Sequence, residues 1–139
     1  MGNRLELVIG GRAQGKSAYA RKKYPHAVYL DERDLTEDGS LLIDEDKAHE
    51  IILWDHFHLC VRIWQQAGMT MDEMQDTIEE SCRACKHLVI ISDEVGNGVV
   101  PLQKEDRIYR DLVGNLLIGI ASKAERVDRI ICQIPQQIK

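Results

Sequence analysis

The sequence predicts an α/β fold in which a mostly parallel sheet lies between layers of helices. Apolar runs typical of buried strands recur along the 139 residues, at 5–9, 27–30, 50–54, 87–91 and 127–132. These runs do not alternate between apolar and polar residues, which is expected of strands that helices cover on both faces. Helical patterns separate the strands, and a glycine-rich turn follows the first of them. These observations together favour a three-layer α/β domain over residues 1–139.

The glycine-rich turn matches the phosphate-loop pattern G-x-x-x-x-G-K-[ST] at every fixed position. Its residues are Gly10, Gly11, Arg12, Ala13, Gln14, Gly15, Lys16 and Ser17. Residues 17–23 continue as a helix, so the order is strand, loop, helix. In that order, backbone N–H groups and the helix N-terminus bind phosphate oxygens. Lys16 reaches the β- and γ-phosphates and the Ser17 hydroxyl ligates Mg²⁺, so we predict a nucleoside triphosphate site of the P-loop NTPase type.

Carboxylates follow two of the other predicted strands. Asp55 comes directly after residues 50–54, and we expect it to hold Mg²⁺ or its water; the alternative is a strand-end or N-cap residue. Asp93 and Glu94 come after residues 87–91, where ligand sites of open α/β sheets lie. Either acid is a candidate general base or an outer-sphere anchor for Mg²⁺. The alternative is a tight surface turn built on the glycines that follow.

Two amphipathic helices are expected in the second half of the chain. A capping box at residues 70–73 opens the first of them. The second covers about 105–125, where apolar residues recur at four-residue steps. Its broad apolar face predicts packing in the core, with a subunit interface as the alternative.

The composition argues against several partners. The formal net charge is −5, and the one basic cluster, Arg21-Lys22-Lys23, is interpreted as a solvated helix face. This balance argues against a nucleic-acid groove or a membrane patch. No apolar run is long enough for a membrane span, and the charged start leads directly into the first strand. We therefore expect a cytoplasmic protein.

Two further patterns are interpreted as structural. Cys82 and Cys85 have the C-x-x-C spacing, but no second pair accompanies them, so free thiols are favoured over a metal or redox site. The acidic segment 31–47 is interpreted as a solvated connection, with a surface lid as the alternative.

One stretch of the sequence resembles a known family. Glu94-Val95-Gly96-x-Gly98-x-Val100-Pro101, with Arg107, Arg110-Asp111 and Gly114 downstream, is similar to the adenosylcobinamide kinase / adenosylcobinamide-phosphate guanylyltransferase family of cobalamin biosynthesis. That family also opens with a strand and G-G-x-x-x-G-K-S, and closes with a strand like residues 135–139. The resemblance implies a RecA-like P-loop enzyme, a trimer, that uses ATP or GTP with Mg²⁺ to phosphorylate the corrinoid adenosylcobinamide. It implies that Lys16 and Glu94 are catalytic and that Glu94 lies near the acceptor.

The family also transfers GMP through a guanylylated histidine in the pattern R-I-x-x-H-x-x-x-R. Residues 31–50 hold no such pattern, and His49 is the one histidine among them. By position alone, His49 and His58 are the candidates to replace the guanylylated histidine. The sequence therefore favours the kinase reaction without the guanylyl transfer. Two alternatives stay open: a nucleotide-binding sensor or assembly module that has lost catalysis, and a kinase of another small alcohol.

Overall fold

The computed structural model describes residues 3–95 and 103–139, and its centre is one six-stranded sheet. The strands are β1 (Arg4–Gly10), β2 (Val28–Leu30), β3 (Ile51–Trp54), β4 (His87–Asp93), β5 (Arg126–Ile131) and β6 (Ile134–Gln137). Their order across the sheet is β2-β3-β4-β1-β5-β6, and every neighbouring pair is parallel except β5 and β6. The predicted mostly parallel sheet is confirmed.

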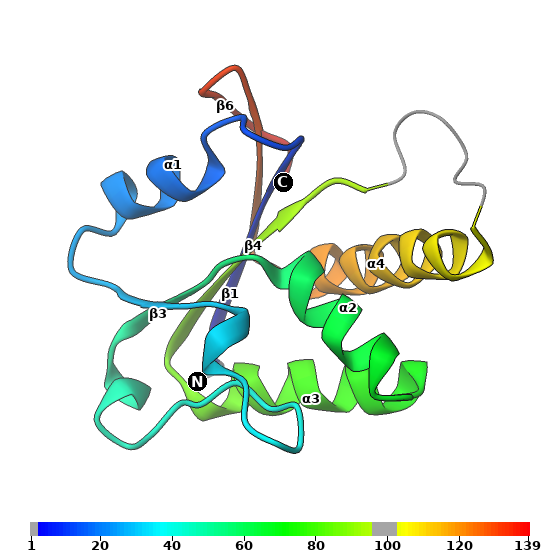
Figure 1. Cartoon of the computed structure of the whole chain (residues 1–139). Coiled ribbons are helices and arrows are strands. Elements are labelled where there is room, and N and C mark those ends of the chain that lie inside the picture. Colours follow the sequence, from blue (N-terminus) through cyan, green and yellow to red (C-terminus); the bar gives the residue numbers. More distant parts are fainter. Residues whose placement is uncertain (1–2, 96–102) are drawn as a thin grey trace.

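Helices cover both faces of this sheet, as Figure 1 shows. They are α1 (Lys16–Lys23), α2 (Phe57–Gln66), α3 (Met71–Ala84) and α4 (Lys104–Lys123), with two 3₁₀ turns, η1 (Glu32–Asp34) and η2 (Lys47–His49). Helix α1 lies on one face, and α2, α3 and α4 lie on the other. Within the described residues, none of these helices combines the length and the apolarity needed to cross a membrane.

The two faces of β1 explain why the apolar runs do not alternate. Leu5 and Leu7 point into the larger core with α2, α3 and α4, whereas Val8 packs with Ala20 on the α1 side. Alternate side chains of the strand are therefore buried on opposite faces, so nearly every position must be apolar. The capping box at Thr70 is present in the structure, where α3 begins.

The apolar face of α4 belongs to the core. Leu116, Ile120 and Ala124 are buried, as the four-residue steps predict, and Val113 is buried beside them. Ile108, which begins the same series, is 42% exposed. Ile118, on the opposite side of the helix, is 70% exposed.

The strand expected over residues 127–132 ends one residue early, because Cys132 begins a turn. Cys132 and Gln133 have φ angles of 50° and 65°, and together they link β5 to β6. Left-handed backbone costs roughly 1–2 kcal/mol per residue for L-amino acids, and glycine or asparagine is the usual choice in such two-residue turns. Neither residue here is a common turn former, so the sequence pattern hides the hairpin.

The acidic segment 31–47 is a connection that packs against α2. Leu35 and Leu41 form an antiparallel bridge within it, and Leu41 is buried. The indole of Trp64 donates a hydrogen bond of 2.9 Å to the carbonyl oxygen of Gly39. These contacts fix the middle of the segment against the core.

The basic cluster of α1 is in large part the solvated face that the sequence suggests, since Arg21 and Lys22 are exposed, whereas Lys23 is half-buried. The Arg21 guanidinium stacks on the Tyr29 ring at 3.9 Å, and the Lys23 ammonium lies 3.1 Å from a carboxylate oxygen of Glu6. The partners of both cations are on strands that lie under the helix. The sequence pattern alone does not reveal these contacts.

Glu6 is the centre of a buried polar cluster under α1. Burial alone raises the pKa of Glu6, but hydrogen bonds from His87, Tyr24 and Lys23 outweigh burial and lower the pKa to about 2. The carboxylate is therefore ionised at neutral pH and is held by three donors.

The cysteines are free thiols, as expected. Burial raises the pKa of Cys60 to about 12 and that of Cys85 to about 11, so both stay protonated at neutral pH. The described residues contain one group of three potential metal ligands, and none of its members is a cysteine.

Candidate nucleotide-binding site

The phosphate loop joins β1 to α1 at the carboxyl end of the sheet. Gly15 has a φ of 92°, and the first helical hydrogen bond runs from the Tyr19 N–H to its carbonyl oxygen at 3.0 Å. A Cβ atom on Gly10 would lie 2.5 Å from the carbonyl oxygen of Ile130 on β5, so only glycine fits there. The two glycines thus serve different purposes: one permits the turn, and the other permits close strand packing.

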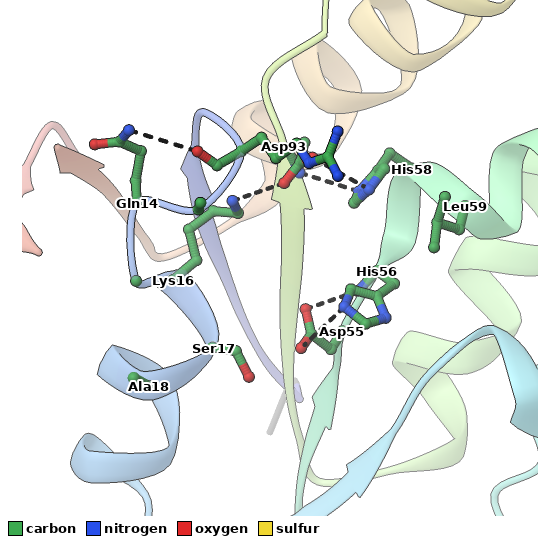
Figure 2. Close-up of a pocket in the computed structure, with 12 residues that line it drawn as sticks. Gln14, Lys16, Ser17, Ala18, Asp55, His56, His58, Leu59 and Asp93 are labelled. Atoms are coloured by element: carbon green, nitrogen blue, oxygen red, sulfur yellow. Dashed lines mark hydrogen bonds and ion pairs between the residues drawn. The ribbon is translucent and has the colours of Figure 1, made fainter. Parts of the chain in front are cut away.

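A cavity of about 610 Å³ opens at the loop, and Figure 2 shows the side chains that line it. Its lining consists of Arg12, Ala13, Gln14, Gly15, Lys16, Ser17, Ala18, Asp55, His56, His58, Leu59 and Asp93. Six of the eight loop positions predicted from the sequence therefore face one cavity together with Asp55. The remaining two, Gly10 and Gly11, precede this lining, and Gly11 contributes its carbonyl oxygen to the lysine described next.

Lys16 is held inside the cavity by two oxygen atoms. Its ammonium lies 2.7 Å from a carboxylate oxygen of Asp93 and donates a 2.7 Å hydrogen bond to the carbonyl oxygen of Gly11. The side chain is only 8% exposed. The charge that would bind phosphate is thus already positioned, and Asp93 balances it.

His58 supports Asp93 from α2. The Asp93 backbone N–H donates to Nδ1 of His58 at 3.1 Å, and Nε2 lies 3.4 Å from the Asp93 carboxylate. Burial lowers the pKa of His58, although the nearby carboxylate opposes this. The imidazole is therefore neutral at pH 7, with its proton on Nε2, on the side of the carboxylate.

Asp55 lies at the end of β3, and β4 separates that strand from β1. The carboxylate on the strand next to the loop is therefore Asp93, whereas the sequence suggested Asp55. Asp55 is nonetheless in the same cavity: it accepts a 2.5 Å hydrogen bond from the Tyr29 hydroxyl and a 2.7 Å bond from the His56 N–H. His56, rather than Asp55, is the N-cap residue of α2.

Tyr29 does not line the cavity itself but holds Asp55, which does, and no sequence motif marks it for this position. Burial, together with its hydrogen bond to Asp55, raises the pKa of Tyr29 to about 12. The hydroxyl is therefore a permanent donor that fixes one carboxylate oxygen. Its one signal in the sequence is its place near the end of a predicted strand.

Glu94 is directed to a different partner. Its carboxylate lies 2.8 Å from the Arg129 Nε and accepts a 3.0 Å hydrogen bond from the same guanidinium. Its backbone N–H donates to the Gly10 carbonyl oxygen at 2.8 Å. Glu94 is not among the residues that line the cavity. The signature residues Gly96, Gly98, Val100 and Pro101, which follow it, fall outside the described residues.

The two histidines considered for guanylyl transfer lie in different places. His49 belongs to η2, which precedes β3 and so lies at the amino ends of the parallel strands, away from the loop. His58 lines the cavity but is engaged with Asp93. His56 also lines it, and its Nδ1 lies 3.0 Å from a Glu32 carboxylate oxygen.

A parallel sheet with a strand, a phosphate loop and a helix at its carboxyl edge defines the class of P-loop NTPase folds. A family model described as "Cobinamide kinase / cobinamide phosphate guanyltransferase" matches residues 30–138, and the chain belongs to this family. The match begins after the phosphate loop, so the loop and the matched region are separate observations. The relationship suspected from residues 94–101 is confirmed.

Two curated relatives agree with this assignment. A bifunctional adenosylcobalamin biosynthesis protein CobP of Pseudomonas aeruginosa is 30% identical over 108 residues, which cover 73% of this chain and 60% of the relative. A bifunctional adenosylcobalamin biosynthesis protein CobU of Salmonella typhimurium is 32% identical over 79 residues, 55% of this chain and 44% of the relative. The chain thus aligns with about half of the length of these relatives.

Proposed function

We propose that this chain is a kinase that transfers the γ-phosphoryl group of ATP or GTP to the hydroxyl of adenosylcobinamide. The observation that carries the proposal is the position of Lys16: its nearly buried ammonium stands in a cavity with the rest of the phosphate loop and two strand-end carboxylates. Membership of the cobinamide kinase family supports the corrinoid as acceptor.

The backbone and the side chains of the loop have different parts in this reaction. The backbone N–H groups at the start of α1 hold phosphate oxygens, and Lys16 offsets the charge that grows on the transferred group. The Ser17 hydroxyl and the Asp55 carboxylate are oxygen donors of the kind that Mg²⁺ prefers, and both line the cavity. When bound there, Mg²⁺ would neutralise negative charge on the phosphates.

Two carboxylates are candidates to accept the proton of the corrinoid hydroxyl. We favour Asp93 because it lines the cavity beside Lys16, whereas the sequence favoured Glu94, whose carboxylate pairs with Arg129. Binding of a triphosphate to Lys16 would release the Asp93 carboxylate, which then becomes available as a base. Comparison of Asp93→Asn with Glu94→Gln separates the two: the base variant loses kcat far more than nucleotide affinity.

Guanylyl transfer is not part of this proposal. The chain lacks the family's histidine pattern, and His58 is neutral and bonded to Asp93. Incubation with α-labelled GTP followed by denaturing electrophoresis is expected to leave the protein unlabelled. Any covalent label on the protein would contradict this part, and loss of the label in His58→Ala would assign it to His58.

The main experiment measures transfer of γ-labelled phosphate from ATP and GTP, with and without adenosylcobinamide. We expect corrinoid-dependent product from the wild type, and at least 100-fold less from Lys16→Ala, because the charge at the transferred group is lost. Lys86→Ala, which removes an exposed lysine before β4, is the matched control. Tight nucleotide binding without turnover would instead support a sensor or assembly module. Turnover with a simple alcohol but not with the corrinoid would support a kinase of another substrate.

The quaternary structure belongs to the same proposal. We propose that residues 1–139 form one nucleotide-binding domain and that three copies assemble, as the family resemblance implies. Light scattering at micromolar concentration tests this, and a mass of 15.9 kDa, that of one chain, would contradict the trimer.

A further inference from the structure

A second cavity lies between α1 and the turn that joins β5 to β6. We propose that it holds the nucleoside half of the triphosphate and that Gln133 is the side chain that contacts this half. The inference rests on the proposed nucleotide binding and extends it to the sugar and base. The cavity has a volume of about 450 Å³, within the usual range for small-molecule sites.

The position of this cavity relative to the first one gives the direction of the ligand. Gly15 and Ala18 line both cavities, so the two spaces meet at the first turn of α1. In the first cavity, Lys16 and Asp93 mark the end where phosphoryl transfer would occur. A triphosphate whose γ end lies there reaches the second cavity when it extends past Gly15 and Ala18.

The β5–β6 turn is built onto the phosphate loop. The Cys132 N–H donates to the side-chain oxygen of Gln14 at 2.6 Å, and the Gln133 N–H donates to the backbone oxygen of Gln14 at 2.9 Å. A Cβ on Gly15 would lie 2.9 Å from Cγ of Gln133, so this side chain crosses the loop where the cavities meet. Both turn residues keep left-handed backbone without being glycine. Backbone strain of this kind persists only where surrounding contacts hold the conformation, and strained residues are concentrated at functional sites.

The lining has the chemistry that a nucleoside needs. The Gln133 amide offers both a donor and an acceptor, which suits ribose hydroxyls or the polar edge of a base. Pro135 of the hairpin and Tyr19 of α1 both line the cavity and supply flat apolar surface. Lys22, which also lines the cavity, adds a positive charge to it. A bare triphosphate would use the loop alone, whereas a nucleotide would use both cavities.

The test compares two ligands by titration calorimetry: a nucleoside triphosphate (ATP and GTP in turn) and inorganic tripolyphosphate, both with Mg²⁺. Gln133→Gly removes the side chain and accepts the positive φ, so the variant is expected to fold at least as well as the wild type. We expect it to bind the preferred nucleotide about tenfold more weakly and tripolyphosphate as the wild type does. Gln133→Asn, which keeps an amide and tolerates left-handed backbone, should lose less.

Two further variants make the result decisive. Gln136→Ala, an exposed glutamine of β6 outside the cavity lining, should bind both ligands as the wild type does. Lys16→Ala should weaken both ligands, and if it changes neither, the proposed nucleotide site itself is wrong. If Lys16→Ala behaves as expected but Gln133→Gly binds nucleotide like the wild type, or loses both ligands equally, the nucleoside cavity is refuted.

Discussion

Asp93→Asn is expected to tighten nucleotide binding while it slows phosphoryl transfer. In the structure the Asp93 carboxylate holds the Lys16 ammonium at 2.7 Å, so an incoming phosphate must compete for this charge. Asparagine keeps a similar shape but is neutral. The lysine then faces the phosphates with less competition, and one negative charge that repels them is removed.

The size of the effect follows from the exposure of the pair. Lys16 is 8% and Asp93 22% exposed, so solvent screens the pair only in part. A hydrogen bond between charged groups of this kind contributes about 1.5–3 kcal/mol, and the asparagine oxygen would retain about 1 kcal/mol of it. The remaining 0.5–2 kcal/mol, roughly, corresponds to about 2- to 30-fold tighter binding.

Calorimetric titration with a non-hydrolysable nucleotide measures this affinity, and the labelled-phosphate assay measures kcat. Titrations with Mg²⁺ and with EDTA separate a contribution of Asp93 to metal binding from its competition for Lys16. Asp106→Asn, which removes a surface carboxylate paired with Arg62 at 2.9 Å, is the control and should change neither quantity. Weaker binding by Asp93→Asn in EDTA would refute the reasoning, because the ion pair would then not oppose the ligand.

Three other changes test separate parts of the structure. Glu6→Gln should lower the free energy of unfolding by about 3 kcal/mol at pH 7, since a pKa lowered from 4.5 to about 2 is worth about 1.4 kcal/mol for each pH unit. The wild type should lose this stability as the pH falls from about 4.5 to 2, and urea titrations that show no such loss would contradict it. Gly10→Ala should destabilise the fold by about 1–3 kcal/mol or more, because its Cβ would press on the Ile130 carbonyl oxygen at 2.5 Å; an unchanged melting temperature would count against this packing. Tyr29→Phe, which removes the 2.5 Å hydrogen bond to Asp55, should raise the Mg²⁺ concentration needed for half-maximal activity several-fold, and an unchanged Mg²⁺ dependence would exclude that role.

The parts of the site that are local in sequence could be predicted, and those that depend on topology could not. Residues 10–17 form one continuous loop, so the pattern that places Lys16 and Ser17 needs no knowledge of the rest of the chain. The place of Asp93 next to that loop depends on β4 lying between β1 and β3, which strand patterns alone do not determine. For the same reason, Asp55 lies one strand further from the phosphate loop than the sequence suggested.

The hairpin formed by β5 and β6 shows a second limit of prediction from the sequence. Cys132 and Gln133 carry no turn signal, because glycine and asparagine are what two-residue turns prefer. Contacts with Gln14, more than a hundred residues earlier, accompany their conformation. Such tertiary support overrides local preference, so the nucleoside cavity becomes visible only in the folded chain.

The most direct test of the account is phosphate transfer to adenosylcobinamide by the purified chain. We expect γ-labelled phosphate from ATP or GTP to appear on the corrinoid with the wild type and with Lys86→Ala, and to fall at least 100-fold with Lys16→Ala. A wild-type chain that binds nucleotide but never labels the corrinoid, under conditions where a family member does, would contradict the central claim.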